Sequence, residues 1–91
     1  MVRYIIQNET LQFASSVEAN CNSITFTNKG APGDIIQIDG YTLAQGESLT
    51  DQGNQGEFNV SRYNVAANVP AFTLFIRRKI YKWWQKLFVL N

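Results

Sequence analysis

The stretch DIIQIDGYTLA, residues 34–44, decides the fold class of this chain. Two runs rich in β-forming residues flank the dipeptide Asp39-Gly40. Both residues of such a dipeptide tolerate the positive φ angles that a two-residue type I′ turn requires. The pattern therefore predicts a β-hairpin that joins residues 34–38 to residues 41–44.

Alternating side chains predict further strands on both sides of this hairpin. Residues 23–28 alternate apolar and polar side chains, which is typical of a strand with one buried face. Residues 57–61 alternate in the same way, so Phe58 and Val60 are expected to face the core. Phe72, Leu74 and Ile76 predict one more strand, continuing to about Tyr81.

Shorter patterns complete the predicted order of elements. Residues 3–7 and 11–13 favour two short strands, and the glycine-rich residues 51–56 favour a polar loop. Six or seven short strands, separated by turns every 8–12 residues or so, are typical of an antiparallel sandwich or small barrel. The sequence therefore predicts one all-β domain, an antiparallel β-sandwich or small barrel, over residues 1–81.

The last residues change the hydrophobic period from that of a strand to that of a helix. Apolar side chains recur there at the spacing of an amphipathic helix, at Ile80, Trp83, Trp84, Leu87 and Phe88. We expect a strand to about Tyr81, followed by a helical turn or an extended arm over residues 82–91. This arm is predicted to dock on a partner.

Charge is segregated along the chain. Residues 71–91 carry five of the eight basic side chains and no acid, whereas residues 1–70 carry seven carboxylates against three cations, a net charge of −4. A short cationic and aromatic end of this kind normally contacts a surface on another molecule. The residues predicted to bind that partner are Arg77, Arg78, Lys79, Lys82, Trp83, Trp84, Lys86, Leu87 and Phe88.

Four interpretations of this end remain open. A protein-docking arm is favoured, because tryptophan and arginine are enriched at interface hot spots. The cations and rings would also suit phosphates and bases of a nucleic acid. A membrane-surface element fits less well, since the stretch is short. In the remaining interpretation the rings cap the domain's own core and the cations are simply solvated.

The composition argues against catalysis. The chain has no histidine and one cysteine, Cys21, which excludes histidine-based nucleophile pairs and zinc sites that need several cysteines. The carboxylates between Asp34 and Glu57 could in principle pair or hold calcium, but the loop at residues 51–56 does not follow the EF-hand spacing. We therefore expect no enzyme, no cofactor, no metal and no small-molecule substrate. A secretory signal and a transmembrane segment are not apparent.

Three segments carry a resemblance to a known group of proteins. Residues 34–49, 56–64 and 76–81 together resemble small β-sandwich virion proteins of bacteriophages, of the capsid-decorating, spike or connector type. The resemblance implies a structural protein that assembles with copies of itself and with other virion proteins, made in the cytoplasm of a host bacterium. It implies no site residue. The alternative function is a small nucleic-acid-binding β-barrel that uses the basic aromatic end.

Overall fold

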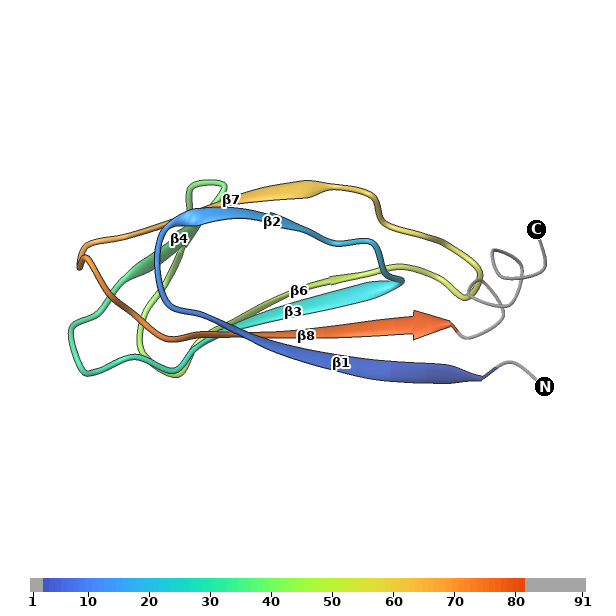
Figure 1. Ribbon diagram of the computed structural model, residues 1–91, viewed down its shortest axis with the longest axis horizontal. Coiled ribbons are helices and arrows are strands. Elements are labelled where there is room, and N and C mark those ends of the chain that lie inside the picture. The colour runs from blue at the N-terminus through green and yellow to red at the C-terminus, as the bar shows by residue number, and fades with distance from the viewer. Residues whose placement is uncertain (1–2, 82–91) are drawn as a thin grey trace.

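A computed structural model describes residues 3–81, and all the regular structure in that range is β (Figure 1). Between Arg3 and Tyr81 no helix is long and apolar enough to cross a membrane. The strands are β1 (Tyr4–Leu11), β2 (Ser15–Glu18), β3 (Ser23–Asn28), β4 (Ile36–Ile38), β5 (Tyr41–Leu43), β6 (Ser48–Gln52), β7 (Arg62–Ala67) and β8 (Leu74–Tyr81).

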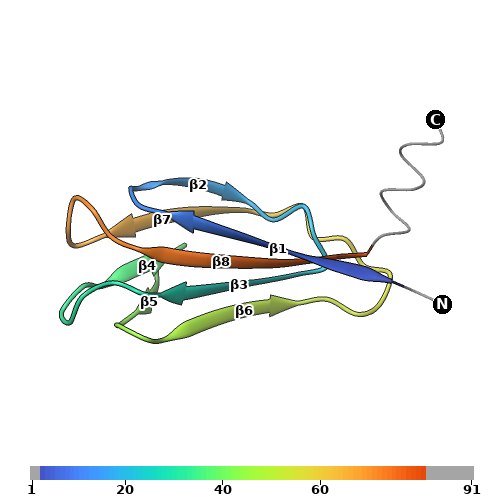
Figure 2. The same ribbon diagram turned by 60° about the horizontal axis from the view of Figure 1, so that its bottom comes forward.

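The strands form two four-stranded antiparallel sheets in two layers. One sheet has the order β1-β8-β3-β6 and the other the order β2-β7-β4-β5. Figures 1 and 2 show the second sheet lying over the first. The predicted all-β class is confirmed, but the part of the chain described here has eight strands rather than six or seven. The predicted arm at residues 82–91 lies outside the described residues.

The strand pairings are nested around the central hairpin. Outward from β4·β5 they run β3·β6, β2·β7 and β1·β8, so the chain resembles a long hairpin folded over on itself. Two further pairings, β4·β7 and β3·β8, join the folded ribbon into its two sheets. This strand order is that of a jelly roll.

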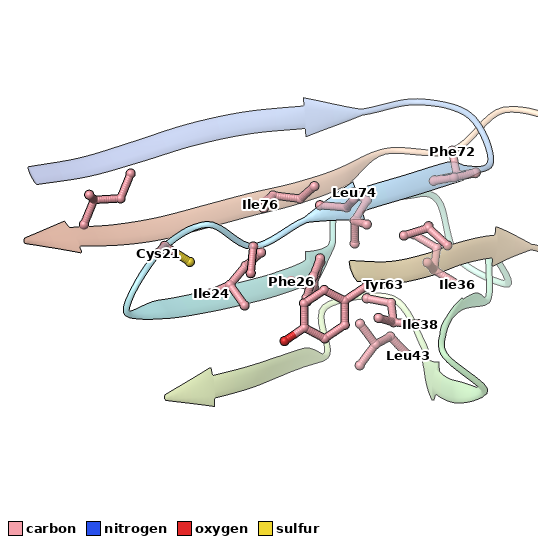
Figure 3. Packing of buried hydrophobic residues seen from close by; sticks show 14 of the residues in the cluster. Cys21, Ile24, Phe26, Ile36, Ile38, Leu43, Tyr63, Phe72, Leu74 and Ile76 are labelled. Atoms are coloured by element: carbon pink, nitrogen blue, oxygen red, sulfur yellow. The ribbon is translucent and has the colours of Figure 1, made fainter. Parts of the chain in front are cut away.

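The hydrophobic core lies between the two sheets. Ile24, Phe26 and Ile76 are fully buried on the inner face of the β1-β8-β3-β6 sheet, as are Ile36 and Leu43 on the facing sheet (Figure 3). The sheets meet at Phe26 and Tyr63, whose ring centroids lie 5.1 Å apart in an edge-to-face arrangement. Each buried side chain of this size stabilises the fold by about 1.5–3 kcal/mol. The alternation predicted at residues 23–28 and 72–76 is therefore confirmed.

The central hairpin also forms as predicted. Asp39 and Gly40 have φ angles of 51° and 85°, which a two-residue type I′ turn requires. The Asp39 carboxylate accepts a hydrogen bond from the Asn64 backbone N–H at 2.8 Å, and the Asp39 N–H donates to the Asn64 carbonyl oxygen at 2.9 Å. The turn residue thus also fastens the hairpin to β7.

The strand predicted at residues 57–61 is wrong. Only Asn59 pairs there, in an isolated bridge with Cys21, and the Phe58 and Val60 side chains are 41% and 72% exposed. Residues 19–21 do lie beside this segment, because the Ala19 N–H donates to the Ser61 carbonyl oxygen at 3.0 Å and the Cys21 N–H to that of Asn59 at 3.3 Å. Tyr63 and Val65 are buried, so odd-numbered positions face the core along β7, and by the same alternation Phe58 and Val60 face outward.

Two other predicted boundaries move. Residues 3–7 and 11–13 belong in part to a single strand, β1, because β8 pairs with every position from Tyr4 to Leu11. Phe13 lies beyond that strand and is exposed. The predicted loop at residues 51–56 starts later, since Asp51 and Gln52 still pair with β3.

Candidate functional site

The register of β8 separates three consecutive cations in the predicted partner-binding segment. Ile76 and Ile80 are buried between the sheets, so side chains two residues apart on β8 share the inner face. Arg78 therefore points inward, while Arg77 and Lys79 point outward. The structure brings Arg77 and Lys79 together on one surface and removes Arg78 from it.

That surface is the outer face of the β1-β8-β3-β6 sheet, which we call the basic face. Its members follow from the strand register and the alternation of side chains. The face carries two cations and no carboxylate. Its residues are Tyr4, Ile6, Asn8, Thr10, Ser23, Thr25, Thr27, Ser48, Thr50, Gln52, Phe75, Arg77, Lys79 and Tyr81, the last of which is buried.

Aromatic rings position one of the two cations. The Lys79 ammonium lies 4.6 Å from the centroid of the Tyr4 ring and 5.4 Å from that of Tyr81. Such contacts contribute about 0.5–1 kcal/mol at exposed sites. Lys79 is thereby held at the end of the face where β1 begins and β8 ends, and Tyr4 itself remains exposed.

Arg77 is the exposed charge of the face. It makes no ion pair with any residue between Arg3 and Tyr81. Its neighbours across the sheet are Asn8 on β1 and Thr25 on β3. An exposed guanidinium with neutral neighbours can still form bidentate bonds to a carboxylate or phosphate from outside.

Hydroxyl groups cover the other half of the basic face. The Thr25 and Thr50 hydroxyls are hydrogen-bonded at 3.1 Å, and those of Thr27 and Ser48 at 2.8 Å. These cross-strand pairs keep short polar side chains in rows over β3 and β6. The whole face can therefore offer hydrogen bonds beside two positive charges to an anionic, polar surface.

Arg78 instead ties the two sheets together. Its Nε and Nη2 atoms donate to the Glu18 carbonyl oxygen at 3.2 and 2.9 Å, and Nε also donates to that of Ala19 at 3.1 Å. Its Nη1 atom pairs with the Glu9 carboxylate at 2.7 Å. With its side chain 14% exposed, Arg78 contributes to the fold rather than to the basic face.

A polar depression of about 410 Å³ on another side of the molecule was not predicted. The Tyr63 hydroxyl donates to the Asp51 carboxylate at 2.6 Å and accepts from the Asn59 amide at 2.9 Å. Burial, followed by the bond to Asp51, raises the pKa of Tyr63, so this hydroxyl stays protonated. No sequence pattern pointed to this cluster: Asn59 lies only four residues from Tyr63, but Asp51 lies twelve residues away and is brought to the hydroxyl by the fold.

Cys21 is buried beside the core and is not suited to nucleophilic chemistry. Desolvation raises the pKa of its thiol to about 11, although the nearby Arg78 charge acts in the opposite direction. The thiol is therefore protonated at neutral pH. Within residues 3–81 no group of three or more metal-binding side chains occurs.

The other residues predicted to bind a partner lie outside the described range. They are Lys82, Trp83, Trp84, Lys86, Leu87 and Phe88. In the sequence they follow Tyr81, the last residue of β8.

Comparisons with protein-family models, with curated proteins and with solved structures find no match for this chain. The features that point to a function are therefore the geometry of the basic face and the sequence that follows it.

Proposed function

We propose that this protein is a structural component of a bacteriophage particle, which self-associates and docks on a larger assembly through the basic face and residues 82–91. The observation that carries the proposal is the charge pattern of the basic face, which has Arg77 and Lys79 but no carboxylate in a chain with seven acids. A cationic, hydroxyl-rich sheet surface complements an acidic protein surface, and such complementarity orients docking.

Two further observations support an assembly role over catalysis. The jelly-roll strand order is one that viral capsid domains use, although this is an analogy between folds and weighs less than the surface itself. The charged residues make up 16% of the chain, below the quarter that is usual in soluble domains. A low charge content favours a protein that works in contact with others.

The docking surface is tested by charge reversal. We expect the chain to be retained on immobilised polyglutamate at low salt, and the double variant Arg77→Glu/Lys79→Glu to lose that retention. The matched control is Lys29→Glu with Arg62→Glu, which makes the same charge change away from the basic face. Equal loss in both double variants would reject the basic face as the docking surface.

The virion assignment needs its own measurement. Antibodies raised against the purified protein should label the phage particles that are released from bacteria producing this chain. Electron micrographs of those particles would show the label. Particles that stay unlabelled while the protein remains in the cell debris would reject the virion role, whatever the result of the charge reversal.

A second candidate function is binding of single-stranded nucleic acid. It is favoured by the exposed Tyr4 ring, which shares the face with Arg77 and Lys79, as the stacking rings on RNA-binding sheets do. Binding of a fluorescent oligothymidylate should then fall steeply with salt and weaken in Tyr4→Ala. Anisotropy that does not change at low salt would exclude this candidate.

A further inference from the structure

Within residues 3–81 the two sheets have four edge strands, each with a neighbour on one side, and one of them differs from the rest. β2, β5 and β6 have four, three and five residues, whereas β1 has eight. Long exposed edges invite pairing with another chain, and proteins normally shorten, charge or cover them. β1 is therefore the edge of this molecule that most needs a partner.

The sequence of β1 does not protect it against pairing. The strand YIIQNETL contains neither proline nor lysine, and its one charged residue is Glu9. Glu9 shares the inner side of the sheet with Ile76 and is neutralised by Arg78. The Glu9 carboxylate therefore forms an ion pair within the fold and does not oppose the approach of a second strand.

Backbone geometry shows which groups of β1 face outward. The Lys29 N–H donates to the Thr73 carbonyl oxygen at 2.9 Å, just before β8 begins. By alternation, the odd-numbered residues of β8 direct their backbone N–H and C=O groups toward β3. The even-numbered residues of β8 then face β1, and the register pairs them with odd-numbered residues of β1. The backbone N–H and C=O groups that remain at the open edge are those of Tyr4, Ile6, Asn8 and Thr10.

We propose that two copies of this chain pair through β1, antiparallel about a two-fold axis at Asn8, and so join their sheets into one of eight strands. In this arrangement Asn8 lies opposite its own copy, and Ile6 lies opposite Thr10. Both pairs direct their backbone groups to the open edge, and each such pair exchanges two hydrogen bonds. The partner is a second copy because the strand complements itself.

Side-chain pairing selects this register over its neighbours. With the axis at Asn8, Ile5 meets Leu11 and Gln7 meets Glu9, so an apolar side chain faces an apolar one and an amide faces a carboxylate. An axis at Gln7 would set Ile5 against Glu9. An axis at Glu9 would place two carboxylates directly opposite each other, which is destabilising.

The dimer would give the self-association in the proposed function a defined surface. The biological role of the dimer rests on that proposed function, but its geometry does not. Pairing along β1 makes the basic faces of two copies continuous and brings two sets of Arg77 and Lys79 to one side of the sheet. Two linked sites bind one particle more tightly than one site does. The test below uses the purified full chain alone, so its failure would leave the docking and virion tests unaffected.

The experiment combines sedimentation with amide hydrogen exchange. We expect the full chain to sediment with twice its mass of 10.3 kDa at high concentration. We also expect the amides of Ile6, Asn8 and Thr10 to lose protection when the protein is diluted. Asn8→Pro removes an outward N–H from an edge strand, so it should weaken the dimer at least tenfold and leave the fold intact.

The control is Thr50→Pro on the opposite edge of the same sheet. The Asn28 N–H donates to the Glu47 carbonyl oxygen, so by alternation the Thr50 N–H also points away from the sheet. This variant should keep the dimer. If Asn8→Pro fails to fold, Asn8→Lys replaces it: two lysines opposite each other should weaken the dimer, and added salt should restore part of it.

Three results would overturn the proposal. One is a full chain that stays monomeric across micromolar concentrations. Another is a dimer that Thr50→Pro weakens and Asn8→Pro does not, which would place the contact at β6. The third is a monomeric full chain whose shortened form, ending at Tyr81, dimerises, because residues 82–91 would then occupy the edge themselves.

Discussion

Arg77 and Arg78 are adjacent in the sequence, yet they lie on opposite sides of β8 and contribute to different properties. The Arg78 guanidinium replaces water around the carbonyl oxygens of Glu18 and Ala19 and the carboxylate of Glu9. The Arg77 guanidinium bonds to none of the residues from Arg3 to Tyr81 through an ion pair. Stability and docking can therefore be separated by substituting one arginine at a time.

The substitution Arg78→Met keeps much of the side-chain stem and removes the donors. We expect it to lower the free energy of unfolding by about 2 kcal/mol, because hydrogen bonds from a charged donor contribute about 1.5–3 kcal/mol. Arg77→Met should stay within about 0.5 kcal/mol of the parent. Urea unfolding at constant m-value measures both. Equal midpoints for the two variants would show that Arg78 does not tie the sheets together.

Cys21 provides a test through pH. Its thiol titrates near 9 when exposed and near 11 in the fold, so the folded state holds its proton longer than the unfolded state does. Stability should therefore be level below pH 9 and fall as pH rises from 9 toward 11. The raised pKa of Tyr63 acts in the same direction at the alkaline end.

The measurement is urea unfolding from pH 7 to 10.5, with Cys21→Ala as the comparison. The variant should show a shallower loss of stability between pH 9 and 10. In the folded parent a thiol reagent at pH 8 should react only at the rate of unfolding, since the side chain is buried. Rapid labelling of the native protein would contradict this assignment.

Among the elements, the β4-β5 hairpin depends most directly on local sequence. An ideal Cβ at Gly40 would meet no atom within 4 Å, so space does not explain why glycine stands there. The φ angle of 85° does, because L-residues with a branched Cβ resist positive φ. The same conformational demand applies to Asp39 at 51°, where a short polar side chain tolerates it.

Replacement of Gly40 measures that demand. We expect Gly40→Val to lower the free energy of unfolding by about 1 kcal/mol or more, and Gly40→Asn to lower it far less, since asparagine accepts this region. Thermal melting followed by circular dichroism suffices. A Gly40→Val protein that melts at the same temperature as the parent would refute the turn assignment.

For single strands and turns, the sequence predicts those features that depend on a few neighbouring residues. The hairpin and the buried face of β3 need only neighbouring side chains, and both are confirmed. Phe58 and Val60 have the same local pattern as Ile24 and Phe26, but they are exposed because they continue the outward-facing side of β7, on which Tyr63 and Val65 point the other way into the core. Alternation separates the two faces of a segment, but it does not show which face meets the core.

For the whole molecule, the division at Tyr81 is the main prediction. The core is formed by residues from Val17 to Tyr81, and β8 completes the sheet. A chain that ends at Tyr81 should therefore unfold cooperatively but lose binding to its larger assembly. Circular dichroism and co-sedimentation with purified particles measure the two properties. An unfolded shortened chain would show that residues 82–91 belong to the core.

The candidate site was predictable to a similar, limited extent. The cationic character of residues 77–79 is plain in the sequence, and so is the absence of nearby acids. Alternation with Ile76 and Ile80 already places Arg78 on the inner face, but its partner Glu18, and the Tyr4 ring beside Lys79, are brought to it by segments far apart in the sequence. Contacts over such separations follow from topology, which no local pattern specifies.

The nesting of the strands also has a consequence for synthesis. Among residues 3–81, β1 pairs only with β8, and Tyr4 is matched with Tyr81. At translation rates of about 5–20 residues per second, β1 leaves the ribosome roughly 4–15 seconds before its partner strand does. During that interval a chaperone, or the same segment of a neighbouring nascent chain, can reach it first. Because β8 is made last, β1 is the first strand to be made and the last that can pair within its own chain.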